Sequence, residues 1–391
     1  MIWSHPALAL PPGRGPTRGW CPGVLDPMET GDGWLLRVRV PGGFVTAASL
    51  RAVGAIAAGF GSGIVDITSR ANLQIRGIPA ERLDRATAAV VDAGLVGNNA
   101  RTDAFRAVVS NPLTGHDRSA VCDSRPVVEA LVTRLVDGIT GAAPSKFGIV
   151  IDDGGGWPLG GLDADIALRA NSDGSWQVRL RGAREPIGRT AEPVRLAEVA
   201  TQWCVDAASR MDRLVATVGI ASIASRLALA APADDAPARP SKTGDRRLIG
   251  VLPHADEARA NVVAAPFLGR VDPEVLTEVA SLATARGADL RLTPDHSLAL
   301  CGVAVSAAAE LVVQLGELGL VVDRDDPRAP ISACVGSAGC LWARADTLTA
   351  GTKLAATRIG AGRVHLSACA KQCGAPSGVR QLVADANGTF R

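Results

Sequence analysis

The sequence contains no tyrosine, and aromatic residues make up only 3% of its 391 residues. Proteins that bind single-stranded nucleic acid stack bases on aromatic side chains, so we expect no nucleic-acid partner. The net charge of +2 creates no strong field for an anionic polymer or a membrane surface. Prolines interrupt the N-terminal apolar patch, which predicts neither a secretory signal nor a transmembrane helix.

A nucleotide-binding fingerprint is also missing. The glycine clusters at 61–63 and 154–156 lack the G-x-G-x-x-G spacing between a strand and a helix, so NADH is not expected to bind this chain directly. Eight cysteines in 391 residues do not resemble a disulfide framework. We therefore expect a cytoplasmic protein with reduced thiols.

Four of the eight cysteines form two pairs in loops rich in glycine, alanine and serine. Cys334 and Cys340 have the spacing C-x5-C, and Cys369 and Cys373 have the spacing C-x3-C. Zinc knuckles usually show C-x2-C or C-x4-C, whereas a cubane cluster is wider than one ion and suits longer spacers. The pattern favours a 4Fe-4S cluster over zinc, and unliganded core thiols remain a third interpretation.

Alternating and helical patterns predict an α+β fold. The first part has the order strand, helix, strand pair, helix, which is roughly ferredoxin-like. Its expected elements are a strand at 33–40, a helix at 46–60, two strands within 64–78 and a helix at 79–95. Farther on, we expect a strand ending in a turn within 101–115, a hairpin about 172–174 and one long helix at 193–215.

The chain also contains an internal repeat. A shift of 225 residues lays 67–78 on 292–303 and 92–96 on 317–321 without a gap. One shift that serves strand, turn and helix indicates a duplication, with chance similarity as the alternative. Arginines lie on the strand pair of the first half, and the two cysteine pairs lie in the second half. Such halves can build one site at their interface.

The chain resembles the sulfite and nitrite reductases that carry siroheme beside a 4Fe-4S cluster. The features that carry this resemblance are the cysteine pairs, the Thr-x-Arg motif at 68–70 and the duplicated halves. Within that superfamily, "RGWCPG", "GDGWLLRVRVPGG", "PSKFG" and "CAKQC" resemble the precorrin-3B synthases, the monooxygenases of aerobic cobalamin biosynthesis. The resemblance implies two tandem halves about a pseudo-twofold axis. Each half is a ferredoxin-like half-domain followed by a nitrite/sulfite reductase-type α+β domain.

The expected domains follow from this resemblance. They are an irregular segment at 1–18, half-domain 1 at 19–98, a reductase-type domain without a cluster at 99–230, a linker at 231–247, half-domain 2 at 248–325 and a short cluster-binding domain at 326–391.

The resemblance also implies a reaction. Precorrin-3A, O2 and electrons derived from NADH give precorrin-3B by hydroxylation at C-20 with γ-lactone formation, and a separate reductase delivers the electrons. The implied cofactors are the 4Fe-4S cluster and a second iron centre, which is mononuclear iron in the synthases and siroheme in the reductases. In the reductase pattern, Cys373 bridges the cluster and the haem iron.

Uroporphyrin-type tetrapyrroles carry about eight carboxylates, so their pocket needs fixed cations. By the resemblance, the basic residues Arg70, Arg106 and Lys146 contact the tetrapyrrole or act in catalysis. The full expected tetrapyrrole-binding set is Arg70, Asn72, Gln74, Arg106, Asn111 and Lys146.

One departure from the reductases bears on the chemistry. They carry a second lysine two residues after the position of Lys146, and this chain has Gly148 there. Loss of that cation disfavours binding of a small oxyanion and leaves room for O2. The alternatives are a siroheme-dependent sulfite or nitrite reductase, and a non-enzymatic iron–sulfur electron carrier or zinc-stabilised scaffold.

Overall fold

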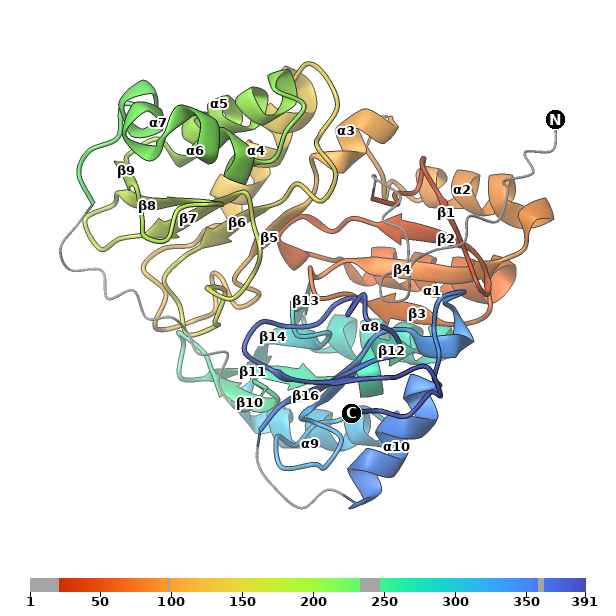
Figure 1. Cartoon of the computed structure of the whole chain (residues 1–391). Helices are drawn as coiled ribbons and strands as arrows, with labels where there is room; N and C mark the ends of the chain where they lie inside the picture. The colour runs from red at the N-terminus through yellow and green to blue at the C-terminus, as the bar shows by residue number, and fades with distance from the viewer. Residues whose placement is uncertain (1–20, 98, 233–246, 358–361) are drawn as a thin grey trace.

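A computed structural model describes residues 21–97, 99–232, 247–357 and 362–391 (Figure 1). The expected irregular segment at 1–18 lies outside the described residues, as does almost all of the expected linker at 231–247. No helix in the described ranges is long and apolar enough to cross a membrane.

The first ferredoxin-like half follows the predicted order of elements. Its strands alternate buried and less buried residues, and the Thr46 side chain caps the first long helix by accepting from the Ser49 N–H at 3.0 Å. The elements are β1 (Met28–Thr30), β2 (Gly33–Val38), α1 (Ala47–Phe60), β3 (Val65–Ile67), β4 (Leu73–Ile78) and α2 (Leu83–Asp92).

The second ferredoxin-like half repeats this arrangement. Its four-stranded sheet has the order β10-β11-β14-β13, and the sheet of the first half has the order β1-β2-β4-β3-β12. The elements are β10 (Gly250–Pro253), β11 (Arg259–Ala264), β12 (Arg270–Val271), α8 (Pro273–Ala285), β13 (Asp289–Leu292), β14 (Leu298–Ala304) and α9 (Val305–Glu317).

Reciprocal contacts join the two halves. Gly43 and Gly269 both have φ of +77°, and each packs against a carbonyl of the other half. A Cβ at Gly43 would lie 2.4 Å from the Leu292 oxygen, and one at Gly269 would lie 3.0 Å from the Ile67 oxygen. Since the 225-residue shift lays Ile67 on Leu292, the contacts are related by an approximate twofold axis. The predicted duplication is confirmed.

The same symmetry extends to the strands. Arg270 of β12 pairs with Asp66 on the edge of the first sheet, and Phe44 forms the matching bridge to Arg291. The helices α1 and α8 pack together, and one hydrophobic core contains residues from both halves. The first half, drawn in red to orange, therefore lies directly against the teal second half (Figure 1).

Residues 99–230, which were expected to form the second domain, contain a five-stranded sheet of order β5-β6-β7-β8-β9. The strands β5, β6 and β7 are parallel, and β7, β8 and β9 are antiparallel, which confirms the predicted hairpin. The elements are α3 (Ala100–Ala104), β5 (Val108–Ser110), α4 (Arg125–Gly138), β6 (Ile149–Asp152), β7 (Ile166–Ala170), β8 (Trp176–Leu180), β9 (Gly188–Thr190), α5 (Pro193–Asp206), α6 (Met211–Val218) and α7 (Ile220–Arg226).

Two predicted elements of this domain are wrong in part. The strand expected from 101 begins only at Val108, because Asn99 and Thr102 form a capping box that starts the helix α3. The long helix expected at 193–215 ends at Asp206. The chain then turns through Ala208 at φ +44°, and the buried Asp165 accepts the Met211 N–H at 3.1 Å, which starts α6.

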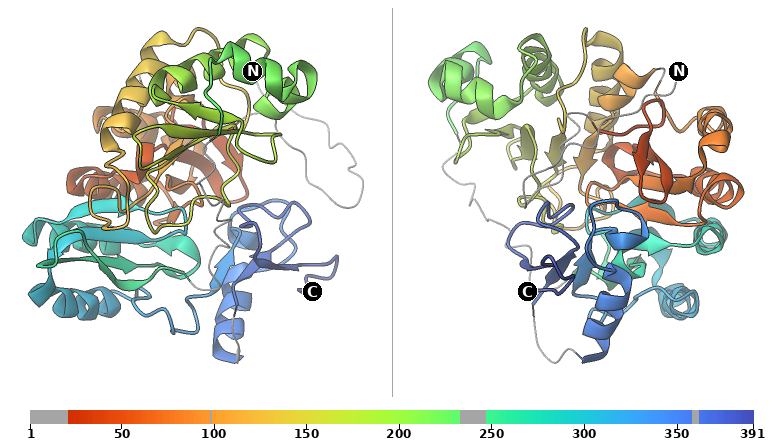
Figure 2. Two further views of the ribbon diagram at one scale, coloured as in Figure 1. Left: turned by 90° about the vertical axis from the view of Figure 1, so that its left-hand side faces the viewer. Right: turned by 45° about the vertical axis from the view of Figure 1, so that its right-hand side comes forward.

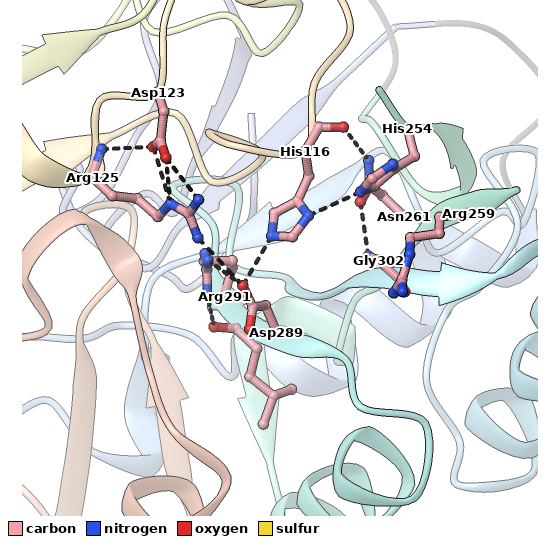
Figure 3. Close-up of polar contacts among 10 residues, drawn as sticks. His116, Asp123, Arg125, His254, Arg259, Asn261, Asp289, Arg291 and Gly302 are labelled. Carbon is pink, nitrogen blue, oxygen red and sulfur yellow. Dashed lines mark hydrogen bonds and ion pairs between the residues drawn. The ribbon is translucent and has the colours of Figure 1, made fainter. Parts of the chain in front are cut away.

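A joint of polar side chains connects the domain at 99–230 to the second half (Figure 3). His116 Nδ1 lies 3.0 Å from His254 Nε2, and His116 Nε2 lies 3.0 Å from the Asp289 carboxylate. The Asn261 amide donates to the His116 carbonyl at 3.3 Å. Side chains from two loops and from two strands of one sheet thus fix how these parts of the chain meet.

The C-terminal domain has a parallel three-stranded sheet of order β15-β16-β17. Cys334 directly follows β15, and Cys369 and Cys373 follow β16. Carboxyl ends of parallel strands meet at one sheet edge, so the two cysteine loops lie together. Figure 2 shows this blue domain beside the teal half. The elements are β15 (Ile331–Ala333), α10 (Thr347–Thr357), β16 (Val364–Ser367) and β17 (Arg380–Val383).

Candidate functional site

A cavity of about 1080 Å³ lies where both halves, the domain at 99–230 and the cysteine loops meet. All four paired cysteines line it, together with basic residues from several elements. The basic lining residues are Arg37, Arg39, Arg70, Arg76, Arg101, Lys146, Arg270 and Lys371. The lining also contains the thiol of Cys21 and the carboxylates of Asp26, Glu29, Asp66, Asp103 and Asp163, so cations outnumber carboxylates around the paired thiols.

Backbone groups shape the first cysteine loop. The Ala368 N–H donates to the Cys334 sulfur at 3.2 Å, and the Cys340 N–H donates to the Gly336 carbonyl at 3.0 Å. Gly336 has φ of +67°, and a Cβ there would lie 2.5 Å from the Thr347 hydroxyl. The loop thus needs glycine to fold tightly around its two sulfurs.

Arginines from the ferredoxin-like halves hold this loop in place. Arg76 of β4 donates to the Gly339 carbonyl at 2.8 Å and pairs with Asp32 at 3.1 Å. Arg270 of β12 donates to the carbonyls of Cys334 and Val335. The strands of the two halves therefore position the cysteines, although they carry none of the four.

Electrostatics couples the four thiols. Burial raises the pKa of the Cys334 thiol, the N–H groups of Ala368 and Gly336 lower it, and negative charge on Cys369 and Cys340 raises it further. Partial removal from water raises the pKa of Cys373, and the other three cysteines add to this, against Lys371. Thiolates that raise one another's pKa repel one another, and bound iron would relieve that repulsion.

The spread of the sulfurs bears on which metal group fits. In the ranges that the structure describes, no three His, Cys, Asp or Glu side chains converge as ligands of a single ion. In a 4Fe-4S cluster each cysteine binds a different iron, so the sulfurs surround a larger group. The donor set, the glycine-rich loops and the amide directed at Cys334 therefore fit such a cluster better than one zinc ion.

Arg37 and Gln74 face each other across β2 and β4. The Gln74 oxygen accepts from Arg37 Nε at 3.1 Å and Nη2 at 2.8 Å in the amide orientation that satisfies both groups. Burial lowers the Arg37 pKa to about 10; Cys21 opposes this, and the neighbours Arg39, Arg70 and Arg76 lower the pKa further. Among the residues with described positions, no carboxylate forms an ion pair with Arg37. Its charge is available to an anion in the cavity.

Four of the six predicted tetrapyrrole-binding residues line the cavity. Arg70 lies in the turn between β3 and β4, where its guanidinium also donates to the Asp163 carbonyl. Asn72 accepts the Val40 N–H at 2.9 Å, and Gln74 holds Arg37. Lys146 is exposed and has φ of +63°. The structure brings these residues together with Cys334, Cys340, Cys369 and Cys373.

The other two predicted residues lie outside the cavity lining. Arg106 donates to the Arg39 carbonyl at 3.3 Å and lies 3.7 Å from Asp103. Asn111 is buried and donates to Asp153 at 2.7 Å. Here Arg106 and Asn111 support neighbouring loops.

Sequence reasoning missed several lining residues. Arg37 in β2 and Arg39 directly after it alternate with Leu36 and Val38, and this alternation in "GWLLRVRV" could have placed both arginines in the lining. No comparable pattern marks Trp342, which reaches the cavity from an irregular loop. Gly148, where the reductases carry a lysine, lies beside Arg70: a Cβ would be 2.7 Å from Arg70 Nη1.

Comparisons with known proteins agree with this architecture. A profile of the nitrite/sulfite reductase ferredoxin-like half domain matches residues 26–93. The precorrin-3B synthase of a Sinorhizobium species is 31% identical over 378 residues, which cover 92% of this chain and 79% of the relative. The chain belongs to the precorrin-3B synthase family. The relatives are named as enzymes, and the chain is an oxidoreductase of the wider superfamily.

More distant relatives define that superfamily. A sulfite reductase [ferredoxin] of Mycobacterium tuberculosis is 28% identical over 338 residues, which cover 80% of this chain and 61% of the reductase. The structure of the Mycobacterium tuberculosis NirA protein matches with a TM-score of 0.72 at 22% identity, over 88% of this chain and 69% of that one. This likeness confirms the predicted α+β fold with its ferredoxin-like halves.

Proposed function

We propose that the protein is an O2-dependent precorrin-3B synthase, which hydroxylates precorrin-3A at C-20 and forms the γ-lactone. One observation carries the proposal: four coupled thiols and a set of cations, Arg37 among them without a carboxylate partner, line one cavity large enough for a macrocycle. Family membership supports the same substrate.

The basic wall is proposed to bind the substrate carboxylates. Arg37 offers a planar pair of donors, and Gln74 fixes its plane. Arg70 and Lys146 add charge from two other loops. Because several cations act from different elements, they fix the orientation of the ring as well as its affinity.

The four cysteines would hold a 4Fe-4S cluster. Bound there, the cluster would supply electrons for the reduction of O2, in which one oxygen atom enters the product and the other leaves as water. Electrons derived from NADH would come through a partner reductase. The Ala368 N–H would stabilise negative charge on the Cys334 sulfur. Reduced thiols fit a cytoplasmic location.

A siroheme-dependent sulfite or nitrite reductase is the second candidate. The cationic cavity favours it, because an oxyanion needs such charges. The surroundings of Gly148 disfavour the reductase, because Arg70 occupies the space that a side chain at this position would need. Arg70 also donates a hydrogen bond to the Asp163 carbonyl.

The experiment is anaerobic purification and cluster reconstitution, followed by incubation with precorrin-3A, O2 and an artificial reductant. We expect O2-dependent conversion to the hydroxylactone and no turnover of sulfite. Metal analysis of the same sample should give iron with acid-labile sulfide. One zinc without sulfide would support the scaffold alternative. Cluster-loaded protein that converts sulfite but not precorrin-3A would support the reductase.

A further inference from the structure

The loop after Cys340 exposes two large apolar side chains. Leu341 is 67% exposed and Trp342 is 44% exposed, and both line the cavity that holds the cysteines and the cations. Leaving such side chains in water is unfavourable, by an amount proportional to the apolar area. An apolar pair at the mouth of a charged cavity therefore suggests a ligand surface.

The backbone of this loop is fixed. The Gly339 carbonyl accepts from the Gly31 N–H at 3.2 Å and from Arg76 at 2.8 Å. The Arg344 N–H donates to the Ala368 carbonyl at 2.9 Å. A Cβ at Gly31 would lie 3.0 Å from the Leu341 nitrogen, so the β1–β2 turn packs directly on the loop. Leu341 and Trp342 are held where they are, and the loop cannot turn them into the core.

The surroundings restrict what can cover them. On the same cavity, Arg37 and Arg70 present cationic groups that need an anionic partner. A small inorganic anion could bind the arginines but would leave the apolar pair in water. An occupant that satisfies both surfaces is flat and apolar on its face and carries carboxylates on its rim.

We propose that Trp342, with Leu341 beside it, is the apolar contact for the face of a carboxylate-bearing macrocycle and makes the cavity selective for such molecules over small oxyanions. The proposal rests on the proposed function, which places a tetrapyrrole in this cavity, and adds a residue to it. An indole ring suits the role because it offers a large rigid apolar surface that stacks on a conjugated ring.

The test uses uroporphyrin III, a metal-free tetrapyrrole with eight carboxylates, and the full chain with its cluster reconstituted. Dissociation constants are measured by absorbance titration for the wild type, Trp342→Ala and Trp342→Phe. The matched control is Leu348→Ala, because Leu348 is 45% exposed on α10 but does not line the cavity. We expect about tenfold weaker binding for Trp342→Ala, at most about threefold for Trp342→Phe, and no change for Leu348→Ala.

Iron and sulfide contents, measured on every variant, verify that the neighbouring Cys340 still binds the cluster. If Trp342→Ala binds uroporphyrin III within twofold of wild type, the inference is overturned while the proposed tetrapyrrole site stands. A variant that binds normally but accepts electrons more slowly from a donor protein also overturns it, in favour of a docking surface. If the wild type does not bind uroporphyrin III, the proposed function fails and the inference fails with it.

Discussion

At the scale of single residues, the cation on β2 is the clearest functional feature. The Arg37 guanidinium is largely removed from water, and this burial lowers its pKa to about 10. Three other arginines lie near it and lower the pKa further. Such an arrangement is unfavourable in the empty cavity and becomes favourable when carboxylates arrive. It is the electrostatic pattern of a binding site.

The Arg37→Gln variant should separate the effect of Arg37 on ligand affinity from its effect on fold stability. We expect uroporphyrin III affinity to fall about tenfold, since one charge-assisted contact is lost. Thermal stability should stay the same or rise slightly, because a buried cation is removed. Titration and thermal unfolding check this, with Arg82→Gln on the exposed start of α2 as the control. Equal affinities for wild type and Arg37→Gln would contradict the assignment.

The cysteine quartet makes a second prediction at this scale. Cys369→Ser should lose iron, acid-labile sulfide and activity together, because serine is a poor cluster ligand. Cys204→Ala is the control: Cys204 is buried in α5, where burial raises its pKa to about 12, and it lies away from the cavity. A cluster retained in Cys369→Ser, or lost in Cys204→Ala, would refute the assigned ligands.

The candidate site could be predicted in part from the sequence. Spacing alone singles out Cys334 and Cys373 with their partners, because metal ligands leave a local signature. Arg70 is predicted from the Thr-x-Arg motif at 68–70, and Gln74 is predicted as a neutral neighbour on the same strand pair. The motif could not tell that Arg106 turns toward Asp103, since that depends on packing between loops distant in sequence. For the same reason it could not find Trp342.

At the scale of elements, turns and buried charges decide where helices end. The pattern of 193–215 is helical throughout, yet the helix stops at Asp206. The buried carboxylate of Asp165 accepts from Arg210 Nε at 2.6 Å and from the N–H groups of Met211 and Gly148, both at 3.1 Å. A tertiary anchor of this kind has no counterpart in local sequence periodicity.

Asp165→Asn should therefore destabilise the domain at 99–230. The substitution removes the negative charge and leaves the partly buried Arg210 without its ion-pair partner. Breaking a buried ion pair in this way lowers the free energy of unfolding by roughly 3 kcal/mol in comparable cases. Urea unfolding of the variant should show a lower midpoint than wild type. Asp173→Asn, at an exposed hairpin turn, should change the midpoint little. If both variants unfold alike, Asp165 is not the anchor of α6.

At the scale of the whole molecule, the joint in Figure 3 links the two parts of the chain through a pair of histidines. In the tautomer in which His254 Nδ1 accepts the Asp256 N–H at 2.8 Å, His254 Nε2 carries the proton and donates to His116 Nδ1. His116 Nε2 then donates to Asp289, which also pairs with Arg291. If His116 were protonated, its Nδ1–H would face the Nε2–H of His254, so that two donors would oppose each other.

This joint predicts a pH dependence of stability. Burial lowers the His116 pKa from its usual value of 6.5, against the raising effect of Asp289. The unfolded chain therefore takes up the proton at a higher pH than the folded chain. The contribution of the joint is complete above pH 6.5 and falls as the pH drops below it. In urea unfolding at pH 7.5 and 5.5, wild type should lose more stability than His116→Gln. An identical loss in both would contradict this role.

The two-half architecture was predictable because duplication leaves the same residues at one constant shift. The reciprocal packing of Gly43 and Gly269 on carbonyls of the opposite halves follows from that symmetry. The cavity does not follow from the repeat. It forms where the halves differ, with arginines on one side and cysteines on the other, and that difference turns a symmetric scaffold into a single site.

The central claim is that this cavity hydroxylates a metal-free tetrapyrrole with O2. The most direct measurement is the mass of the product when reconstituted protein, precorrin-3A and a reductant react under 18O2. The account predicts a hydroxylactone that carries one heavy oxygen, with no product under nitrogen and none from Cys369→Ser. Product formed without label, or unchanged precorrin-3A beside an intact cluster, would contradict it.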